Sequence, residues 1–596
     1  MFYSLGMSSF KYIWNYIRKY KWLYIAGIAT LFVVDFASLF IPKLTGEITD
    51  GLSSGDFTMR DVIIRLGYIL IFGVIMTLGR VGWRFFFMGT SRDVERDIRN
   101  DMFEHLSTLS SRYFQTMASG DLMSRFSNDL SSIRQAIGPA IISLFDGTVM
   151  TIMVLFQMVF YVDYRLTIIT MIPMVLIAIG VGIYGGIMHR LSTDRQEALA
   201  SLTDYTRESF TGIRVIKSFV REKYRIREFI KENINTRDKT LKLNYMVSLV
   251  WPLLDLIIEL SIFITLIYGG YLTIQGKITL GRFVAYNQYI IMLIWPMMAC
   301  GDAVNSFSQG AASIDRIREV MNEEPEIIDG PEVIESEIDD WSLSAKNLTF
   351  TYPEREDAGL FDICFDHPSG KCLAITGKTG CGKTTFAELL VQVYRVPVNC
   401  LFIGGRDINS IGIKYLRDNI AYVPQDDFLF SDTILNNILF GVKNNDFSNS
   451  NAEALAVRYA KEACVHDNIM DFSEKYNTWV GERGVTLSGG QKQRICIARA
   501  LIKSSKILIL DDAMSAVDTD TERQLISNIF RLREGQTTII IAHRITAISR
   551  ADHILVMDEG RIVQQGTHEA LVDIDGTYRD LYLRQQLEDE YKGVLG

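Results

Sequence analysis

Six long apolar stretches crowd the first 310 residues of this 596-residue chain, and no comparable stretch occurs later. A helix that crosses the hydrocarbon core of a bilayer needs about 20 mostly apolar residues, and each stretch reaches that length. The pattern therefore predicts an α-helical transmembrane domain with six spans, at about residues 22–45, 62–88, 138–162, 164–188, 246–274 and 283–307.

The connections between these spans differ in length and charge. A tiny turn near Asp163 and Arg165 separates the third span from the fourth, whereas residues 189–245, rich in lysine and arginine, separate the fourth from the fifth. Basic residues gather in the cytoplasmic segments of membrane proteins. We therefore expect residues 189–245, and with them both ends of the chain, to be cytoplasmic.

Two connections, residues 89–137 and 189–245, are too long and too polar to be turns. Few prolines and frequent charge pairs favour helical continuations of the spans. Each contains a break of small residues, at 118–121 and at 211–212. We expect long cytoplasmic helical extensions that reverse at these breaks and present short transverse helices to a cytosolic partner domain. The alternative is a solvated helical hairpin without a partner.

Acidic residues within the predicted spans are costly in lipid and commonly face a cavity or a partner. Asp255 and Glu259 are four residues apart in the fifth span, so they share one helix face. That face is a candidate substrate pathway that favours cationic solutes. The alternative is that these carboxylates lie near span ends and reach water, or cap neighbouring helices.

The overall composition excludes some function classes. The net charge is −9 and the isoelectric point is near 5.5, with 48% hydrophobic and 22% charged residues. Nucleic-acid binders usually carry a basic surface, so we expect no nucleic-acid partner. The seven cysteines are odd in number and show no CxxC spacing. Six of them lie within residues 364–496, and we interpret these as reduced thiols of a cytosolic domain, because neither a disulfide framework nor a zinc site is supported.

An acidic linker follows the sixth span. Residues 321–340 contain two prolines and lack a periodic apolar face. We therefore divide the chain into a transmembrane domain with two long intracellular loops at residues 1–320, a linker at 321–340, and a nucleotide-binding domain at 341–596. In the last of these the pattern changes to strand, loop and helix.

A phosphate-binding loop opens that last domain. The short apolar strand 372–376 runs into Gly377-Lys-Thr-Gly-Cys-Gly-Lys-Thr384, a GxxxxGK[ST] motif with an apolar helix after it. Glycines let backbone N–H groups wrap the phosphates of ATP, Lys383 supplies a positive charge, and the Thr384 hydroxyl is a ligand for Mg²⁺. The predicted nucleotide-binding residues here are Gly377, Lys378, Thr379, Gly380, Cys381, Gly382, Lys383, Thr384 and Thr385.

Two further strands end in polar residues. The strand 506–510 ends in Asp511 and Asp512, and the strand 537–542 ends in His543. An apolar parallel strand that delivers a carboxylate at its carboxyl edge is what a Mg²⁺–ATP site requires. We assign Asp511 to the metal and expect His543 to lie beside the γ-phosphate.

Between these motifs lies Leu487-Ser-Gly-Gly-Gln-Lys-Gln-Arg494, and here the chain resembles a half-transporter of the ATP-binding cassette (ABC) exporter family over its whole length. The resemblance implies that Tyr352 stacks on adenine and that Gln425 links the metal site to the membrane helices. It implies a signature of Ser488, Gly489, Gly490 and Gln491. It also implies a loop at 515–518 that crosses between cassettes, a switch histidine at His543, and an exporter segment at 481–484 that touches the intracellular loops.

The same resemblance implies a dimer. In this family the signature of one cassette contacts the γ-phosphate of ATP held by the other, and this chain has one phosphate loop and one signature. Two ATP molecules would be sandwiched between two cassettes. Differential ATP binding would then shift the transmembrane helices between inward- and outward-facing states.

One position departs from the family pattern. The residue after Asp511 is normally a glutamate that orients or deprotonates the attacking water, and here it is Asp512, one methylene shorter. A displacement of ~1 Å can cost ~10²-fold in rate, so we expect the site on this chain's own motifs to be catalytic but slow. This resembles the degenerate-site subunit of heterodimeric bacterial exporters, whose partner chain carries the glutamate. The alternative is a homodimer in which Asp512 works with the retained His543.

The leading functional hypothesis is an ATP-driven efflux pump for amphipathic, multidrug-type small molecules in a bacterial-type cytoplasmic membrane. Its expected partners are a second half-transporter, the lipid bilayer and a small-molecule substrate. The alternatives are a lipid or peptide exporter, an exporter-shaped importer, and an ATP-gated channel. A soluble cassette ATPase is excluded by the six predicted spans.

Overall fold

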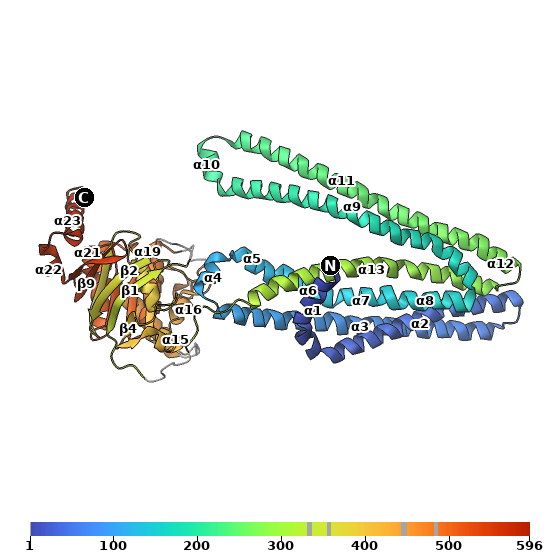
Figure 1. The fold of residues 1–596 in the computed structure, drawn as a ribbon, viewed down its shortest axis with the longest axis horizontal. Coiled ribbons are helices and arrows are strands. Elements are labelled where there is room, and N and C mark those ends of the chain that lie inside the picture. Colours follow the sequence, from blue (N-terminus) through green and yellow to red (C-terminus); the bar gives the residue numbers. More distant parts are fainter. Residues whose placement is uncertain (1, 331–336, 354–358, 443–449, 482–486, 596) are drawn as a thin grey trace. The chain divides into compact units, whose positions relative to one another are not determined.

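The computed structural model describes the backbone of residues 2–330, 337–353, 359–442, 450–481 and 487–595 (Figure 1). The chain divides into two compact units. The helical unit comprises Met1–Ser107 and Ser119–Glu323, and the α/β unit comprises Thr108–Ala118 and Glu324–Gly596. Segment 108–118 thus belongs with the α/β unit, whereas the sequence-based division placed it in the transmembrane domain, residues 1–320.

The helical unit contains helices long and apolar enough to cross a membrane. In the described part of the chain five such runs occur, at Lys21–Ser54, Met59–Thr108, Ser119–Val162, Asp255–Ile274 and Leu280–Met321. The fourth predicted span, 164–188, lies in α9 (Tyr164–Thr211), where the side chains of 174–185 are outside the described residues. The helices of this unit are α1 (Phe2–Lys19), α2 (Lys21–Ser54), α3 (Met59–Thr108), α5 (Ser119–Ser124), α6 (Leu130–Ile137), α7 (Pro139–Phe145), α8 (Thr151–Gln157), α9, α10 (Ile213–Ser218), α11 (Glu222–Ile264), α12 (Gly270–Ile274) and α13 (Leu280–Met321).

Four of these helices are much longer than a bilayer requires. They are α3, α9, α11 and α13, with 50, 48, 43 and 42 residues. At about 1.5 Å per residue, such helices exceed 60 Å, whereas the hydrocarbon core is about 30 Å thick. The helices therefore continue beyond the apolar part of the membrane, as the sequence predicted.

The helices α9 and α11 run side by side and are joined at one end by α10 (Figure 1). The break between α9 and α10 falls at Gly212, at the predicted position 211–212. Apolar side chains of this connection face solvent: Val215 is 60% exposed, Phe219 71% and Val220 80%. Asp255 and Glu259, the predicted substrate-pathway residues, are both exposed on α11.

The α/β unit is built on a six-stranded sheet with the order β10-β9-β3-β8-β7-β6. All neighbouring strands are parallel except β10, which pairs antiparallel with β9. The carboxyl ends of β3, β8, β7 and β6 therefore meet at one edge. The strands are β3 (Cys372–Gly377), β6 (Ile420–Val423), β7 (Ile507–Asp511), β8 (Thr537–Ile541), β9 (His553–Asp558) and β10 (Arg561–Gly566).

Both faces of this sheet are buried, which explains the continuous apolar runs of its strands. On β7, Leu508 and Leu510 pack into one core, with helices on that face, whereas Ile507 and Ile509 pack into the other. Helices that contribute to the first core include α16 (Ile434–Leu439), α17 (Ser450–Glu462), α19 (Gly489–Ile502), α20 (Thr519–Leu532) and α21 (Ile545–Ile548).

The second core is shared with α14 (Lys383–Leu390) and with a smaller antiparallel sheet of the order β2-β1-β4-β5. Its strands are β1 (Leu343–Thr351), β2 (Gly359–His367), β4 (Leu401–Ile403) and β5 (Arg406–Asp407), and the unit is completed by α15 (Ile413–Asn419), α18 (His466–Met470), α22 (His568–Asp573) and α23 (Thr577–Leu595).

The short helix α4 (Ser111–Thr116) packs within the α/β unit. The hydroxyl of Tyr394 donates to Oε1 of Gln115 across 3.4 Å. Arg112 and Glu326 form an ion pair of 3.6 Å. A transverse helix from the first long connection thus contacts the nucleotide-binding fold, as the sequence predicted for a cytosolic partner domain.

Candidate nucleotide-binding site

The phosphate loop connects β3 to α14, and its glycines are required by the backbone. Gly377 has φ +147° and Gly382 has φ +97°, values that side-chain-bearing residues rarely adopt. A Cβ atom on Gly377 would lie 2.1 Å from the carbonyl oxygen of Met557. The loop conformation therefore depends on glycine at the positions that the motif specifies.

Lys383 lies in this loop with its ammonium group buried; the residue is 7% exposed. Its Nζ donates to the carbonyl oxygens of Gly377, at 3.0 Å, and Lys378, at 2.8 Å. The loop thus holds the ammonium group at its centre. The side chain of Lys378 is directed elsewhere, because its Nζ pairs with Asp558 at 3.0 Å, so only the backbone of Lys378 is available in the loop.

Asp511 ends β7 beside the first turn of α14. It is 1% exposed, and its carboxylate accepts hydrogen bonds from Thr384 and from Tyr422, the latter at 3.3 Å. Burial raises the pKa of Asp511, while the hydrogen bonds from Thr384 and Tyr422 oppose this effect. The arrangement brings a hydroxyl and a carboxylate together, which are the hard oxygen donors that Mg²⁺ prefers.

Asp512 has a left-handed backbone conformation, with φ 48°. Its N–H donates to the carbonyl of Ile541 at 2.9 Å, and its own carbonyl accepts from the hydroxyl of Ser515 at 3.0 Å. Left-handed residues other than glycine are uncommon, and they concentrate at functional sites where the surrounding structure holds them. The conformation directs Asp512 into the cavity described below.

His543 follows β8 at the same edge of the sheet. Burial and the nearby ammonium group of Lys383 lower the pKa of His543 from its ordinary 6.5, although Asp512 acts in the opposite direction. The ring is therefore neutral near pH 7. A neutral imidazole carries one N–H donor and one acceptor.

These residues line one cavity of about 250 Å³. From the predicted site, the cavity gathers Tyr352, Thr379, Gly380, Gly382, Lys383, Thr384, Thr385, Gln425, Asp511, Asp512 and His543. Tyr352 contacts the phosphate-loop helix, with its hydroxyl 2.7 Å from that of Thr385. The fold therefore assembles Tyr352, the phosphate loop, the glutamine, the two carboxylates and the histidine, which are up to 191 positions apart in sequence.

The four signature residues are not among the lining residues of that cavity. Ser488 caps the N-terminus of α19: its Oγ accepts from the N–H of Gln491 at 3.3 Å, and the Gln491 side chain accepts from the N–H of Ser488 at 3.0 Å. Ser488 and Gly489 are exposed, whereas Gly490 is half-buried against Ala516. Of the predicted exporter segment 481–484, residues 482–484 are outside the described residues.

Several residues of the site were not predicted from the sequence. Gly359 and Ile541 line the cavity, and Tyr422 contacts Asp511. Gln493 is buried within α19 and contacts the 515–518 loop, donating to Oγ of Ser515 at 3.1 Å and accepting from the N–H of Ala516 at 2.9 Å. A glutamine on a face that is otherwise apolar is the signal that could have revealed this contact.

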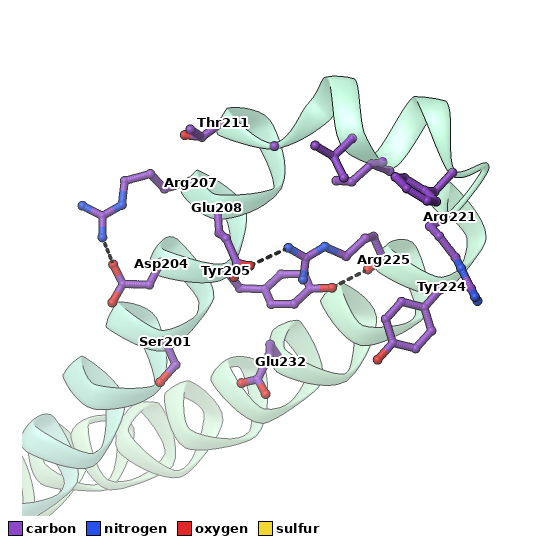
Figure 2. Close-up of a pocket in the computed structure, with 14 residues that line it drawn as sticks. Ser201, Asp204, Tyr205, Arg207, Glu208, Thr211, Arg221, Tyr224, Arg225 and Glu232 are labelled. Atoms are coloured by element: carbon purple, nitrogen blue, oxygen red, sulfur yellow. Dashed lines mark hydrogen bonds and ion pairs between the residues drawn. The ribbon is translucent and has the colours of Figure 1, made fainter. Parts of the chain in front are cut away.

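A second, larger cavity lies in the helical unit, where α9, α10 and α11 meet (Figure 2). Its volume is about 1450 Å³. Polar contacts connect the helices that line it. Arg225 pairs with Glu208 at 3.0 Å, and the backbone carbonyl of Arg225 accepts from the hydroxyl of Tyr205 at 3.1 Å. Figure 2 shows these three side chains pointing toward one another across the hairpin. None of the residues that line this cavity belongs to the phosphate loop.

Comparisons with known proteins agree with both units. Residues 24–297 match the family described as "ABC transporter transmembrane region", and residues 360–515 match the family described as "ABC transporter". The probable multidrug resistance ABC transporter ATP-binding/permease protein YheI of Bacillus subtilis is 36% identical, over 93% of this chain and 94% of that protein. An ATP-dependent lipid A-core flippase of Syntrophus aciditrophicus is 34% identical, over 84% of this chain and 82% of that protein.

Among solved structures, a bacterial Atm1-family ABC exporter with ATP bound has a similar fold, with a TM-score of 0.76 and 26% identity. The match covers 94% of this chain and 99% of that one, so the helical unit and the α/β unit are both included. The chain belongs to the ABC exporters, multi-pass membrane proteins in which a helical transmembrane region is fused to a nucleotide-binding cassette that hydrolyses ATP to drive transport.

Proposed function

We propose that this chain is one half of a dimeric exporter that moves amphipathic small molecules out across the cytoplasmic membrane. The observation that carries the proposal is the assembly of Lys383, Asp511 and His543 around one cavity, while the signature at Ser488 stays outside it. A second chain then has to supply a signature to this cavity, and this chain's signature serves the partner's nucleotide.

The cavity suits Mg²⁺–ATP. Lys383 holds a positive charge where phosphates would lie, and Tyr352 offers an aromatic ring for adenine. Mg²⁺ usually takes one or two protein oxygens together with substrate phosphates and water. Thr384 and Asp511, which already contact each other, and the amide oxygen of Gln425 are the residues that would hold it, and it would neutralise developing phosphate charge.

Two exposed features support a dimer. The N-terminus of α19 has a dipole that favours an anion, and Ser488 and Gly489 are exposed there, where a phosphate can approach. At the connection around α10, Val215 and Phe219 expose apolar side chains outside the predicted spans. Exposed apolar clusters of this kind typically mark contact surfaces, and we assign this one to the cassette of the second half-transporter.

The proposed partner is a different chain that carries glutamate where this chain has Asp512. Asp512 has the charge to orient water, but its carboxylate is set back by one methylene, so hydrolysis at this chain's own cavity is slow. The heterodimer would then have one slow ATP site, at this chain's cavity, and one competent ATP site, at the partner's. In a homodimer both sites would share the shortened carboxylate.

The proposed substrates are amphipathic drugs. The supporting similarity is to a protein whose name describes multidrug resistance. A lipid is the second candidate, since another relative's name describes a lipid A-core flippase. Asp255 and Glu259 remain our proposed contacts for cationic substrates, on the exposed face of α11. Asp255→Asn and Glu259→Gln should then weaken transport of cationic dyes more than that of neutral dyes.

Transport into inverted membrane vesicles tests the whole proposal. With the partner chain present, ATP should drive uphill accumulation of a cationic dye, and Lys383→Met should abolish it. Lys414→Met, an exposed lysine on α15, is the matched control and should leave accumulation unchanged. Dissipation of a dye gradient without accumulation would indicate a channel, and accumulation only in right-side-out vesicles would indicate import.

The identity of the second chain is tested separately. This chain purified alone should hydrolyse ATP slowly, and the complex with a glutamate-bearing half-transporter should be at least about 10-fold faster. Brisk hydrolysis by this chain alone would refute the heterodimer. Faster accumulation of a fluorescent lipid than of any dye would favour the flippase reading.

A further inference from the structure

The C-terminal helix α23 contacts the backbone on both sides of Arg544, the residue after His543. Nε2 of Gln585 donates to the carbonyl oxygen of His543 at 2.6 Å. Oε1 of the same side chain accepts from the N–H of Ile545 at 2.7 Å. Gln585 does not line the nucleotide cavity, so it reaches the site only through this backbone.

The chemistry of this contact is specific to a primary amide. One partner is a carbonyl, which needs a donor, and the other is an N–H at the first residue of α21, which has no acceptor within its own helix. A glutamine side chain offers a donor and an acceptor on one rigid plane. A glutamate of the same length keeps the acceptor but loses the donor, and it sets a carboxylate oxygen against the carbonyl of His543.

Neighbouring contacts fix the rest of this short segment. Before it, the N–H of Ala542 donates to the carbonyl of Ile375 at 3.2 Å. Within it, the Arg544 guanidinium donates to the carbonyl of Val517 at 3.1 Å and pairs with the buried Glu522. The imidazole of His543 also bonds to the backbone of Gly377. Of the two Gln585 bonds, the first acts on the peptide between His543 and Arg544 and the second on the peptide between Arg544 and Ile545. Gln585 thus fixes the backbone directly after His543, while the other contacts act on the strand before it, on the imidazole and on the Arg544 side chain.

We propose that Gln585 is a positioning residue that holds His543 at the nucleotide cavity, so that α23 governs the rate of ATP hydrolysis there. The inference rests on the proposed function, in which this cavity binds ATP, and on the sequence-based expectation that His543 lies beside the γ-phosphate. Without the bond to its carbonyl, the ψ angle of His543 is less restrained, so the backbone that carries the imidazole can shift relative to the cavity. Small displacements of this kind slow a chemical step without changing how tightly the nucleotide is held.

A purely structural role for Gln585 makes different predictions. Two hydrogen bonds that only stabilise the fold would lower the unfolding temperature and reduce nucleotide binding and hydrolysis together. A positioning role lowers the rate of hydrolysis alone, and it does so only while His543 is present. The two roles are therefore separated by a rate-against-binding comparison and by a double-mutant cycle.

The experiment uses the full chain with its partner half-transporter in lipid nanodiscs and a photoreactive azido-ATP labelled on its α-phosphate. After a single turnover and crosslinking, gel separation of the two chains gives the amount of nucleotide on this chain and the fraction converted to diphosphate. The variants are Gln585→Glu, Gln585→Met, His543→Ala and the double variant His543→Ala with Gln585→Glu. The control is Gln586→Glu, the same change at the next position, where the amide donates to the hydroxyl of Tyr582 within the same helix.

We expect Gln585→Glu and Gln585→Met to slow conversion on this chain by about 10-fold, with bound nucleotide changed by less than about 2-fold. In the His543→Ala background, Gln585→Glu should cause no further loss. The inference would be overturned if the Gln585 variants converted ATP as fast as Gln586→Glu. It would also be overturned if their labelling and conversion fell in parallel, or if the losses caused by His543→Ala and Gln585→Glu multiplied in the double variant. If His543→Ala itself had no effect, the proposed role of the histidine would fail, and the inference with it.

Discussion

The hydroxyl oxygens of Tyr352 and Thr385 lie 2.7 Å apart. Tyr352 follows β1 and Thr385 lies in the first turn of α14, so this contact connects the small antiparallel sheet to the phosphate loop. The Tyr352 ring also packs edge-on against Phe350 and Tyr394, each with centroids 5.3 Å apart. An adenine base that stacks on this ring would therefore meet a side chain already fixed in position.

Substitutions at Tyr352 should separate stacking from hydrogen bonding. Tyr352→Phe keeps the ring and loses the contact with Thr385, so we expect nucleotide affinity within about 5-fold of the parent, since a neutral hydrogen bond contributes about 1 kcal/mol net. Tyr352→Ala removes the ring, and we expect affinity to fall by at least about 10-fold, because base–aromatic stacking is worth about 1–3 kcal/mol. Titration with a fluorescent ATP analogue measures both. Equal losses in the two variants would contradict the stacking role.

Lengthening the side chain at Asp512 should accelerate this chain's own site. Asp512→Glu restores the methylene that the family pattern has, and we expect hydrolysis on this chain to rise by about 10- to 100-fold. Asp512→Asn has a side chain of the same size but no charge, so it should reduce the rate of hydrolysis on this chain below that of the parent. Chain-resolved single-turnover hydrolysis is the measurement. If Asp512→Glu left the rate unchanged, a cause other than carboxylate reach would limit the site.

Two stacked histidines should make the α/β unit sensitive to acid. The rings of His367 and His553 are 6.1 Å apart, and burial lowers the pKa of both below 6.5, the charge of His553 adding to the effect on His367. The unfolded chain then binds more protons than the folded chain below about pH 6.5, so stability falls as the pH falls through that window. Unfolding temperatures of the full chain between pH 7.5 and 5.5 measure this loss.

The variant His553→Phe provides the check on that assignment. It keeps an aromatic ring and removes one titrating group, so the unfolding temperature should depend less steeply on pH than in the parent. His568, which bonds the hydroxyl of Tyr578 and lies outside the pair, supplies the control His568→Phe. An identical slope in the parent and in His553→Phe would show that the loss originates elsewhere.

The exposed apolar surface around α10 should be needed for coupling. Phe219→Ser removes a large side chain that is 71% exposed, so the free energy of unfolding of the helical unit should fall by less than about 0.5 kcal/mol. If the partner's cassette covers this surface, ATP-driven dye accumulation should fall by at least about 5-fold, since buried aromatic anchors contribute about 2 kcal/mol or more to an interface. Ile230→Ser, on α11, is the control. Equal dye accumulation by Phe219→Ser and Ile230→Ser would show that this surface does not contact the partner's cassette.

The sequence alone determined the architecture, because its signals are local. Runs of about 20 apolar residues mark spans, and a buried strand followed by a glycine-rich loop marks a phosphate site. Parallel strands share one carboxyl edge, which is why Lys383, Asp511 and His543 could be predicted to meet, and they line one cavity. The assignments of Asp255 and Glu259 to a substrate pathway stay predictions, since side-chain spacing on one helix says nothing of what faces it.

Only the tertiary structure decided how side chains pair across long separations. No local pattern joins Gln585 to His543, 42 positions away, or α4 to the α/β unit, because neither contact repeats with a helical or strand period. The loop conformation, too, determines that the ammonium of Lys383 is held by backbone carbonyls and that Lys378 turns to Asp558. Such pairings follow from how packed elements bring chain segments together, which spacing along the chain does not encode.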